Sequence, residues 1–344
     1  MQKKSRVRLV DVAAAAQVSK QTVSRVVNGS RDVSQETREH VLEVIARMGY
    51  RPSVSARTLC RGRSNTLAVV ASDTGFLATE LYQGAAQQAQ ALGYTLLLRT
   101  LNTPAAASVE QLLLSLTDME VDGVLWAIPD ADGRGDWIDA ALLRRIGVPV
   151  VFLSTAPRTG ISTVSFDNFA GARLATRALV DAGRLRIGHV SGPRGWWVAR
   201  ERIRGWRTEL AASGREAPED WIEAGDWSPA SGERAVARLL ERVPDLDAIF
   251  VANDRMALGG LLAAHRRGLQ IPARLAIMGF DNVPESACFY PPLSTVSQDK
   301  HHHGEHAVAV LVGHVAAGFG EAPPAMRLPE LGHTLMLRET TPPR

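Results

Sequence analysis

Three polar side chains near the N-terminus, Lys20, Gln21 and Arg25, can form hydrogen bonds to DNA base edges and phosphates. They occur in the run 18–28, in which Ser19 can cap a helix. The apolar residues of the run repeat at i, i+3 and i+4 and give this helix a core face; they are Val23, Val26 and Val27. An amphipathic surface helix would show the same pattern, so the neighbouring segments must distinguish the two interpretations.

Those neighbours predict a helix-turn-helix. A short preceding helix is indicated by apolar residues at i, i+3, i+4 and i+7, namely Leu9, Val12, Ala13 and Ala16. Residues 17–19 leave room for a tight turn, and Ser34 can cap a third helix with an apolar stripe at Val41, Val44, Ile45 and Met48. The second helix of such a unit is the one that enters the major groove.

The charge distribution supports this interpretation. Residues 1–63 contain 13 Lys and Arg residues but only five acids, so this segment carries +8 while the rest of the chain carries −5. A basic segment joined to an acidic body is typical of a module that binds a polyanion. The segment also has its own apolar periodicity, which a solvated basic tail would lack.

The N-terminal segment resembles the DNA-binding head of the lactose-repressor family. The resemblance is carried by 9–13, 18–28, 33–38 and 49–52, and it continues almost to the C-terminus. It implies a homodimer that binds a pseudo-palindromic, double-stranded operator. Within the family, the effector-site positions resemble those of the lactose repressor more than those of the purine repressor.

The resemblance also implies a hinge helix at about 53–61, with Ala56 and Leu59 at family positions. This hinge would fold when two copies meet on DNA and insert Leu59 into the minor groove. The candidate DNA-contacting residues are therefore Lys20, Gln21, Thr22, Ser24, Arg25, Asn28, Arg38 and Leu59.

Length and composition fit a small head with a larger body. The chain has 344 residues, of which 45% are hydrophobic, and only two cysteines, Cys60 and Cys288. So few cysteines argue against a disulfide framework and favour a reducing cytoplasm. No apolar run approaches membrane-spanning length, and residues 1–6 lead into no apolar signal segment. We therefore expect a cytoplasmic protein without a membrane partner.

Beyond Arg63, short apolar runs alternate with amphipathic stretches, which predicts parallel sheets covered by helices. The candidate strands are 67–71, 95–98, 123–126, 148–153, 187–190, 248–251 and 275–280. The candidate helices are 80–92, 105–119, 169–182, 200–212 and 256–267, several of them ending at Gly93, Gly183, Gly214 or Gly268. The stretch is too long to form a single sheet, and residues 157–160 are a candidate boundary between two lobes.

The predicted fold is a three-helix helix-turn-helix head and hinge helix, followed by an α/β two-lobed body with two parallel, doubly wound sheets. We expect residues 1–52 to form the head, 53–63 the hinge and linker, and 64–340 the effector-binding and dimerisation domain. The near lobe would span about 64–160 plus 291–320, and the far lobe about 161–290 plus 321–340. The resemblance implies the same architecture, that of periplasmic sugar-binding proteins.

Parallel sheets bind ligands beyond the carboxyl ends of their strands, where this chain places a guanidinium, an indole, amides and a carboxylate. These residues are Arg202, Trp227, Asn253, Asp281 and Gln298. Polar groups can pair with sugar hydroxyls while an aromatic face covers a pyranose ring. For Asn253 and Asp281, helix capping or a turn is an equal alternative from the residues alone. The resemblance implies that all five contact an effector, with Asp73 and Phe76 as weaker candidates from the near lobe.

Some positions depart from the family pattern. Pro157 lies near the position of an acidic sugar contact, and Lys300 stands where an aromatic is expected. Trp196 and Trp197 form an unusual pair in the predicted loop before Arg202, and could narrow the cleft or cap the ligand.

The run 301–306 contains His302 and His306 at i, i+4, which could clasp a metal ion, but no third ligand is placed and a surface helix is the simpler interpretation. Enzyme motifs are absent: there is no phosphate-binding Gly-rich loop, nucleophile elbow or zinc-protease motif. We therefore expect no enzyme activity, no metal and no cofactor.

The main hypothesis is a sequence-specific transcriptional repressor whose operator affinity is controlled by a small sugar or glycoside in the interlobe cleft. A corepressor-dependent or activating regulator of the same family is the alternative within regulation. A soluble sugar-binding or sugar-processing protein with a vestigial head is the alternative from another class. The basic head and its intact recognition face argue against that last alternative.

Overall fold

The computed structural model describes residues 7–27, 30, 32–50, 63–72, 79–101, 106–128, 140–318 and 332–342. The chain divides into two compact units, residues 1–66 with 120–122 and residues 67–119 with 123–344. Asn28, Asp73, Phe76 and the hinge around Leu59 lie outside the described residues.

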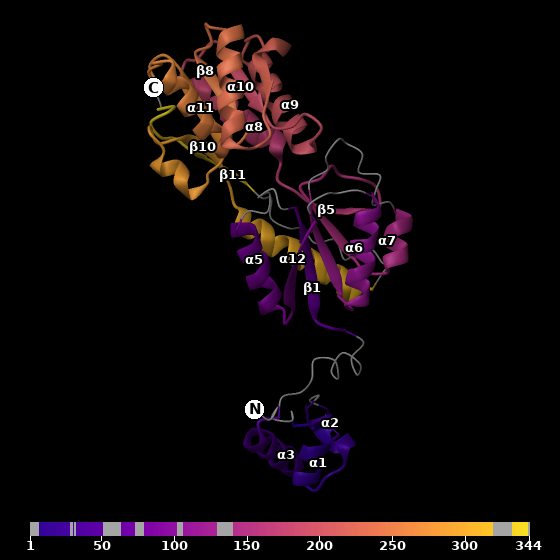
Figure 1. Ribbon diagram of the computed structural model, residues 1–344. Helices are drawn as coiled ribbons and strands as arrows, with labels where there is room; N and C mark the ends of the chain where they lie inside the picture. The colour runs from indigo at the N-terminus through magenta and orange to yellow at the C-terminus, as the bar shows by residue number, and fades with distance from the viewer. Residues whose placement is uncertain are drawn as a thin grey trace, which may run out of the picture. The chain divides into compact units, whose positions relative to one another are not determined.

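The first unit contains the predicted three-helix head (Figure 1). Its helices are α1 (Leu9–Ala15), α2 (Lys20–Val27) and α3 (Gln35–Met48). They enclose a core that includes Val12, Val23, Val26, Val41 and Val44. The periodicity of apolar residues predicted this core correctly, because each stripe faces the other two helices.

The body contains two sheets, and the first has the strand order β2-β1-β3-β4-β5. Its strands are β1 (Thr66–Ala71), β2 (Thr95–Thr100), β3 (Gly123–Ala127), β4 (Val150–Leu153) and β5 (Ser162–Val164). Its helices are α5 (Thr79–Ala91), α6 (Ala106–Asp118), α7 (Ala140–Ile146) and α12 (Lys300–Ala317). We call this sheet with its helices the first lobe.

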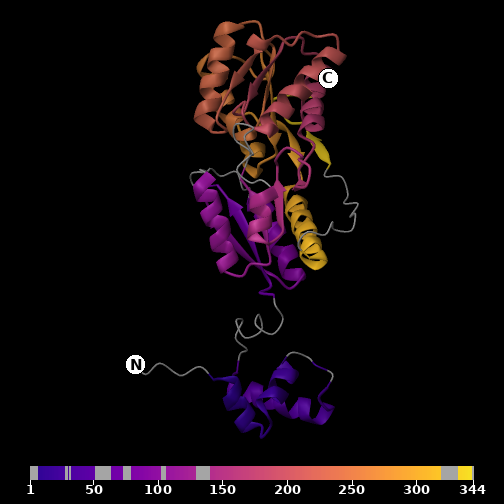
Figure 2. The same ribbon diagram turned by 90° about the vertical axis from the view of Figure 1, so that its right-hand side faces the viewer.

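The second sheet has the order β11-β10-β9-β8-β6-β7. Its strands are β6 (Ile187–Ser191), β7 (Ile222–Ala224), β8 (Ala248–Val251), β9 (Ala276–Asp281), β10 (Ser294–Gln298) and β11 (His333–Met336). Its helices are α8 (Asn168–Asp181), α9 (Trp197–Ala212), α10 (Pro229–Arg242) and α11 (Asp254–Arg266), with short 3-10 turns η2 (Glu219–Trp221) and η3 (Pro284–Cys288). We call this the second lobe; Figure 2 shows α8 and α9 on one face of its sheet and α10 and α11 on the other.

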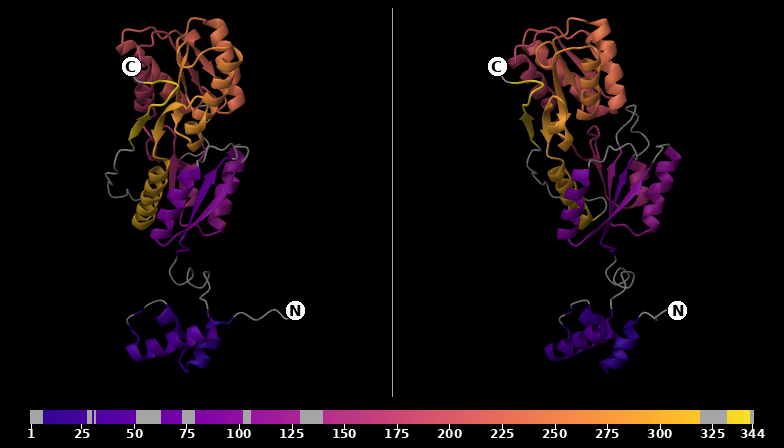
Figure 3. Two further views of the ribbon diagram at one scale, coloured as in Figure 1. Left: turned by 90° about the vertical axis from the view of Figure 1, so that its left-hand side faces the viewer. Right: turned by 60° about the vertical axis from the view of Figure 1, so that its left-hand side comes forward.

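The chain crosses between the lobes three times. It leaves the first sheet after β5, returns after β10 to form α12, and joins the second sheet again at β11. Figure 3 shows the gold helix α12 lying along the first lobe, although β10 immediately before it pairs with β9 of the second. β11 pairs with β10 in the antiparallel direction, so the second sheet has one antiparallel edge.

These pairings correct the lobe boundaries expected from the sequence. The break at 157–160 is a turn before β5, which still pairs with β4 of the first sheet. Residues 294–298, assigned to the near lobe, form β10 of the second sheet. The reason is that sheet membership depends on pairing between distant segments, which hydrophobic runs do not reveal.

Two further expectations about helices were wrong. Trp197 is the first residue of α9 and not part of a loop, and Trp196 is its N-cap residue. The run 301–306 follows the first residue of α12, but this is no simple surface helix, because His303 is 1% exposed and Gly304 and Ala307 are buried.

Candidate functional site

Helix α2 exposes the predicted base-reading face. Ser19 Oγ accepts a hydrogen bond of 3.0 Å from the Thr22 backbone N–H, as expected of an N-cap. Lys20, Gln21 and Arg25 are exposed, so their polar groups are not committed to the core of the head. This face can present donors and acceptors to a groove.

Other candidates on the head also have structural partners. The Thr22 hydroxyl lies 2.9 Å from Ser19 Oγ, within the cap of α2. Ser24 is half-buried. The Arg38 guanidinium donates to the backbone carbonyl of Ser30 and so ties α3 to the segment before it. Arg38 therefore has a role within the head as well as its predicted phosphate contact.

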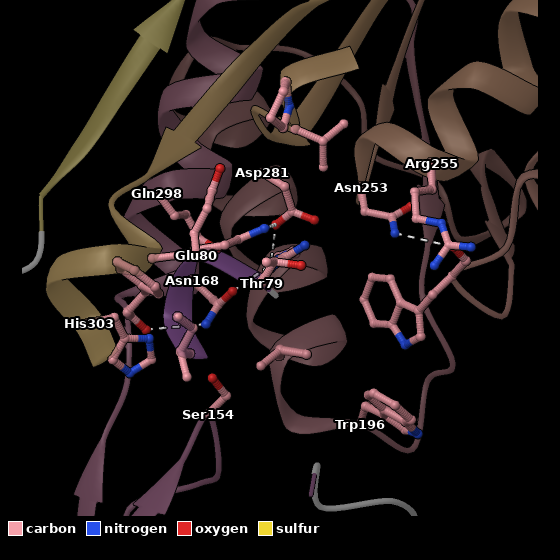
Figure 4. A pocket seen from close by; sticks show the side chains of 18 of the residues that line it. Thr79, Glu80, Ser154, Asn168, Trp196, Asn253, Arg255, Asp281, Gln298 and His303 are labelled. Carbon is pink, nitrogen blue, oxygen red and sulfur yellow. Dashed lines mark hydrogen bonds and ion pairs between the residues drawn. The ribbon is translucent and has the colours of Figure 1, made fainter. Parts of the chain in front are cut away.

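The body contains a cavity of about 740 Å³ that residues of both lobes line (Figure 4). All five effector-contacting candidates outside the loop after β1 contribute to its wall: Arg202, Trp227, Asn253, Asp281 and Gln298. The first lobe contributes the start of α5, Ser154 after β4, and Lys300 and His303 of α12. The five residues that the sequence predicted as one site therefore line the same cavity.

Arg202 is buried in α9 and oriented by three groups. Its Nε donates to Asn168 Oδ1 at 3.0 Å, and a terminal nitrogen donates to the carbonyl of Ala252. The guanidinium carbon lies 3.9 Å from the ring centroid of Phe280. Burial lowers the pKa of Arg202 to about 10, partly offset by the nearby Asp281, so the side chain stays charged near neutral pH.

Asp281 ends β9 and lies between two cations. Its Oδ1 is 4.0 Å from an Arg202 terminal nitrogen and 3.5 Å from Lys300 Nζ. Its φ of 111° lies in a region that non-glycine residues rarely adopt. Backbone strain of this kind is concentrated at functional sites, where the surrounding structure holds a side chain in place. The result is an oriented carboxylate that can accept hydrogen bonds from hydroxyl groups.

Trp227 supplies an aromatic wall. Its ring lies against Gly192, where an added Cβ would be only 2.0 Å from Cζ2, so this position must be a glycine for the indole to fit. The Trp196 ring is 5.7 Å away and tilted by 52°. Within the described part of the chain, the buried Trp227 Nε1 has no hydrogen-bond partner.

Asn253 is a helix cap and a cavity residue at once. Its Oδ1 accepts from the Met256 N–H at 2.9 Å, and its Nδ2 donates to the Trp227 carbonyl at 3.2 Å. Helix capping, the alternative raised from the sequence, is therefore real, although the side chain also lines the cavity. The bond to Trp227 holds the indole-bearing loop, where Trp227 has a φ of 71°.

Gln298, at the end of β10, is 7% exposed, and its Nε2 lies 3.4 Å from the His333 ring nitrogen of β11. The amide thus lies between the edge strand and the cavity. One further amide hydrogen and the amide oxygen can serve a ligand.

Whole-chain comparisons identify relatives of this combination of head and body. Residues 8–53 match the family described as bacterial regulatory proteins, lacI family, and residues 176–341 match the periplasmic binding protein-like domain. The HTH-type transcriptional regulator CelR of Thermobifida fusca is 34% identical over 350 residues, covering 99% of this chain and 100% of the relative. This chain belongs to the LacI family.

Other relatives agree. The ribose operon repressor of Haemophilus influenzae is 34% identical over 305 residues, covering 88% of this chain and 90% of that protein. The lac repressor dimer bound to operator and the anti-inducer ONPF has a TM-score of 0.84 at 29% identity, covering 98% and 100% of the two chains. The CelR–cellobiose complex has a TM-score of 0.71 at 31% identity, covering 97% and 100%.

Membership of the LacI family makes the protein a DNA-binding transcriptional regulator with a periplasmic-binding-protein-like effector domain, and not an enzyme. In the described ranges, no three His, Cys, Asp or Glu side chains are grouped to hold a metal ion. His302 Nδ1 lies 3.6 Å from Glu305 Oε2 and 3.8 Å from Asp299 Oδ2. No helix in the described part of the chain is long and apolar enough to span a membrane.

Sequence reasoning missed two groups of this LacI-family site. Asn168 orients Arg202. The sequence did not mark Asn168 as a residue that follows a strand, because the three-residue strand β5 before it was not predicted. Lys300 was noted only as a departure from the family pattern, yet it contacts Asp281. The crossing from β10 to α12 brings Lys300 there, and no local pattern encodes that crossing.

Proposed function

We propose that this LacI-family chain is a homodimeric repressor that binds a pseudo-palindromic operator and releases it when a small sugar or glycoside fills the cavity. The observation that carries the proposal is that one cavity combines the oriented Arg202–Asp281 pair with the indole of Trp227. A carboxylate and a guanidinium pair with ring hydroxyls, and an indole covers an apolar sugar face.

The size of the cavity favours more than one sugar ring. Its volume of about 740 Å³ is in the upper part of the range of roughly 300–1,000 Å³ that is usual for small-molecule sites. Relatives point the same way, since CelR has been solved with cellobiose and the lac repressor with ONPG. We therefore propose a disaccharide or a glycoside as effector, with an effector-site pattern closest to that of the lac repressor.

For operator recognition, we propose that Lys20, Gln21 and Arg25 read base edges, while Thr22, Ser24, Asn28 and Arg38 contact the backbone or neighbouring bases. Lys and Arg favour guanine, and Gln favours adenine. The exposure of Lys20, Gln21 and Arg25 on α2 supports this assignment. By analogy with the family, Leu59 acts as the minor-groove wedge. Such a regulator works in the cytoplasm, beside the chromosome.

The test is a gel shift of the purified full-length protein with pooled genomic fragments, with and without cellobiose, ONPG, ribose or glucose. We expect retention of a small set of fragments without sugar and release by a disaccharide or glycoside. A sugar that strengthens retention would replace induction by corepression. Retention that no sugar changes, with no sugar bound in calorimetry, would refute the effector assignment.

A further inference from the structure

Lys300 and Asp281 form an ion pair between the two lobes inside the ligand cavity. Lys300 is the first residue of α12 in the first lobe, whereas Asp281 is the last residue of β9 in the second. Lys300 Nζ lies 3.5 Å from Asp281 Oδ1, and the two side chains are 15% and 18% exposed. The other cation at this oxygen, Arg202, belongs to the second lobe, so among the described ion pairs of Asp281 the one with Lys300 spans the two lobes.

Helix α12 is fixed to the first lobe by close backbone contact with α5. A Cβ at Gly304 would lie 2.0 Å from the Leu81 carbonyl oxygen, and one at Gly84 would lie 1.9 Å from the His301 carbonyl oxygen. The His301 ring is also hydrogen-bonded to Gln87 of α5 at 2.9 Å. Lys300 is therefore anchored to the first lobe. Its contact with Asp281 depends on the position of the second lobe relative to the first.

The local sequence does not favour a cation at this position. A helix N-terminus carries a partial positive charge, so a lysine in the first turn is unfavourable unless a negative charge compensates it. The first turn of α12 contains no acidic residue. Among the described residues, the carboxylates near Lys300 include the cap residue Asp299, the buried Asp254 and, in direct ion-pair contact across the cavity, Asp281.

We propose that Lys300 is an interlobe latch: it holds Asp281 in the ligand-free body, and a ligand hydroxyl that donates to Asp281 takes its place. The ligand part of this inference rests on the proposed function, whereas the latch itself does not. Removing the Lys300 charge should loosen the ligand-free arrangement of the lobes. It should also tighten sugar binding, because the hydroxyl no longer competes with an ammonium group.

The variant Lys300→Met is a clean perturbation. It keeps the length of the aliphatic chain, and Arg202 still pairs with Asp281, so no buried carboxylate is left without a cation. Lys300→Arg restores the charge and should restore the latch. Arg255→Met is the matched control, because Arg255 is an exposed cation of the cavity wall but belongs to α11 of the second lobe.

The lobe arrangement can be measured without any ligand by pulsed electron paramagnetic resonance. Spin labels at Gln90 of α5 and Ala212 of α9, both exposed, report the distance between the lobes. Cys60 and Cys288 are replaced by serine in every variant. Labelled subunits are mixed with excess unlabelled protein, so that distances within one subunit dominate.

We expect a distance distribution for Lys300→Met that is broader than, or shifted from, that of the parent, while Lys300→Arg and Arg255→Met match the parent. A distribution for Lys300→Met that coincides with the parent would overturn the latch. So would an equal change in Arg255→Met, because the effect would then not need the interlobe pair. Failure of every sugar to release the operator would end the proposed function, but the distances between the lobes would still decide whether the latch exists.

Discussion

The carboxylate of Asp254 accepts a hydrogen bond of 2.8 Å from the backbone N–H of Val283, two residues after the cavity carboxylate of Asp281. Its other oxygen accepts from the Thr295 hydroxyl at 2.6 Å, so one buried side chain links α11, the turn after β9 and β10. Asp281 and Asn282 have φ values of 111° and 54° in this turn. Asp254 therefore supports the unusual backbone that aims Asp281 at the cavity.

Asp254 should make stability depend on pH. Burial, followed by the negative charge of Asp281, raises the pKa of Asp254 from 3.8 to about 7. Because the folded state holds this proton more tightly than the unfolded state does, stability falls as pH rises from about 4 through about 7. In Asp254→Asn the amide oxygen can accept from the Val283 N–H while the amide NH2 donates to the Thr295 hydroxyl, so the variant should gain about 1–3 kcal/mol relative to wild type over that window.

The measurement for Asp254 is thermal unfolding of wild type, Asp254→Asn and the exposed control Asp245→Asn at one protein concentration and a series of pH values. The Asp245 variant should follow the wild-type curve. Parallel curves for wild type and Asp254→Asn would show that Asp254 does not titrate in this range.

Operator recognition should depend on Gln21. Gln21→Ala removes a bidentate partner for adenine and should cost about 1–3 kcal/mol at the true operator but little on random DNA. Fluorescence anisotropy with both DNAs gives the ratio of affinities. An unchanged ratio would refute base reading by Gln21.

Arg38 should behave differently from Gln21. Arg38→Ala removes the proposed phosphate contact and also the bond to the Ser30 carbonyl, so both DNAs should bind more weakly and the head should unfold at a lower temperature. If binding weakens while the melting temperature of the head is unchanged, the bond to Ser30 contributes nothing to stability.

Arg202 should be required for release from the operator. Arg202→Ala removes the ligand-facing guanidinium and leaves the acceptors on Asn168 and Ala252 without their donor. The variant should retain operator binding, lose sugar-induced release, and be about 1–3 kcal/mol less stable. Operator affinity against sugar concentration is compared with that of Arg255→Ala, which changes an exposed residue of the same wall. Wild-type release by Arg202→Ala would place the effector elsewhere.

The contact between α5 and α12 should tolerate no side chain at Gly304. A methyl group there would meet the backbone carbonyl of Leu81, which cannot rotate away, so Gly304→Ala should destabilise the body by about 1–3 kcal/mol. Gly332→Ala is the control, because no atom of the described residues lies within 4 Å of its added Cβ. Equal denaturant midpoints for the two variants would contradict the close packing.

Local patterns predicted the parts of the fold that local physics determines. Ser19 and Ser34 cap α2 and α3 as expected, because a cap needs only its own helix turn. The central strands were found because they are continuous apolar runs buried on both faces. By contrast, β5 and β7 have three residues each, and β10 reads Ser-Thr-Val-Ser-Gln, so neither length nor hydropathy marked them.

The same distinction applies to the cavity. Arg202, Trp227, Asn253, Asp281 and Gln298 could be found because strand ends and a family resemblance point to them. Asn168 and Lys300 take their roles from partners 34 and 19 residues away in sequence, Arg202 and Asp281. A single sequence does not reveal such pairings.

The three crossings between the lobes mean that neither lobe is a continuous piece of the gene. A reading frame interrupted before codon 300 would omit α12, and the first sheet would expose the apolar surface that Ala307, Val308 and Leu311 now cover. An exchange of gene segments between homologues would face the same obstacle, because any single junction within the body splits at least one lobe between two parents. Recombination should therefore transfer the body as one unit. New DNA specificities should arise when this unit is joined to a different head.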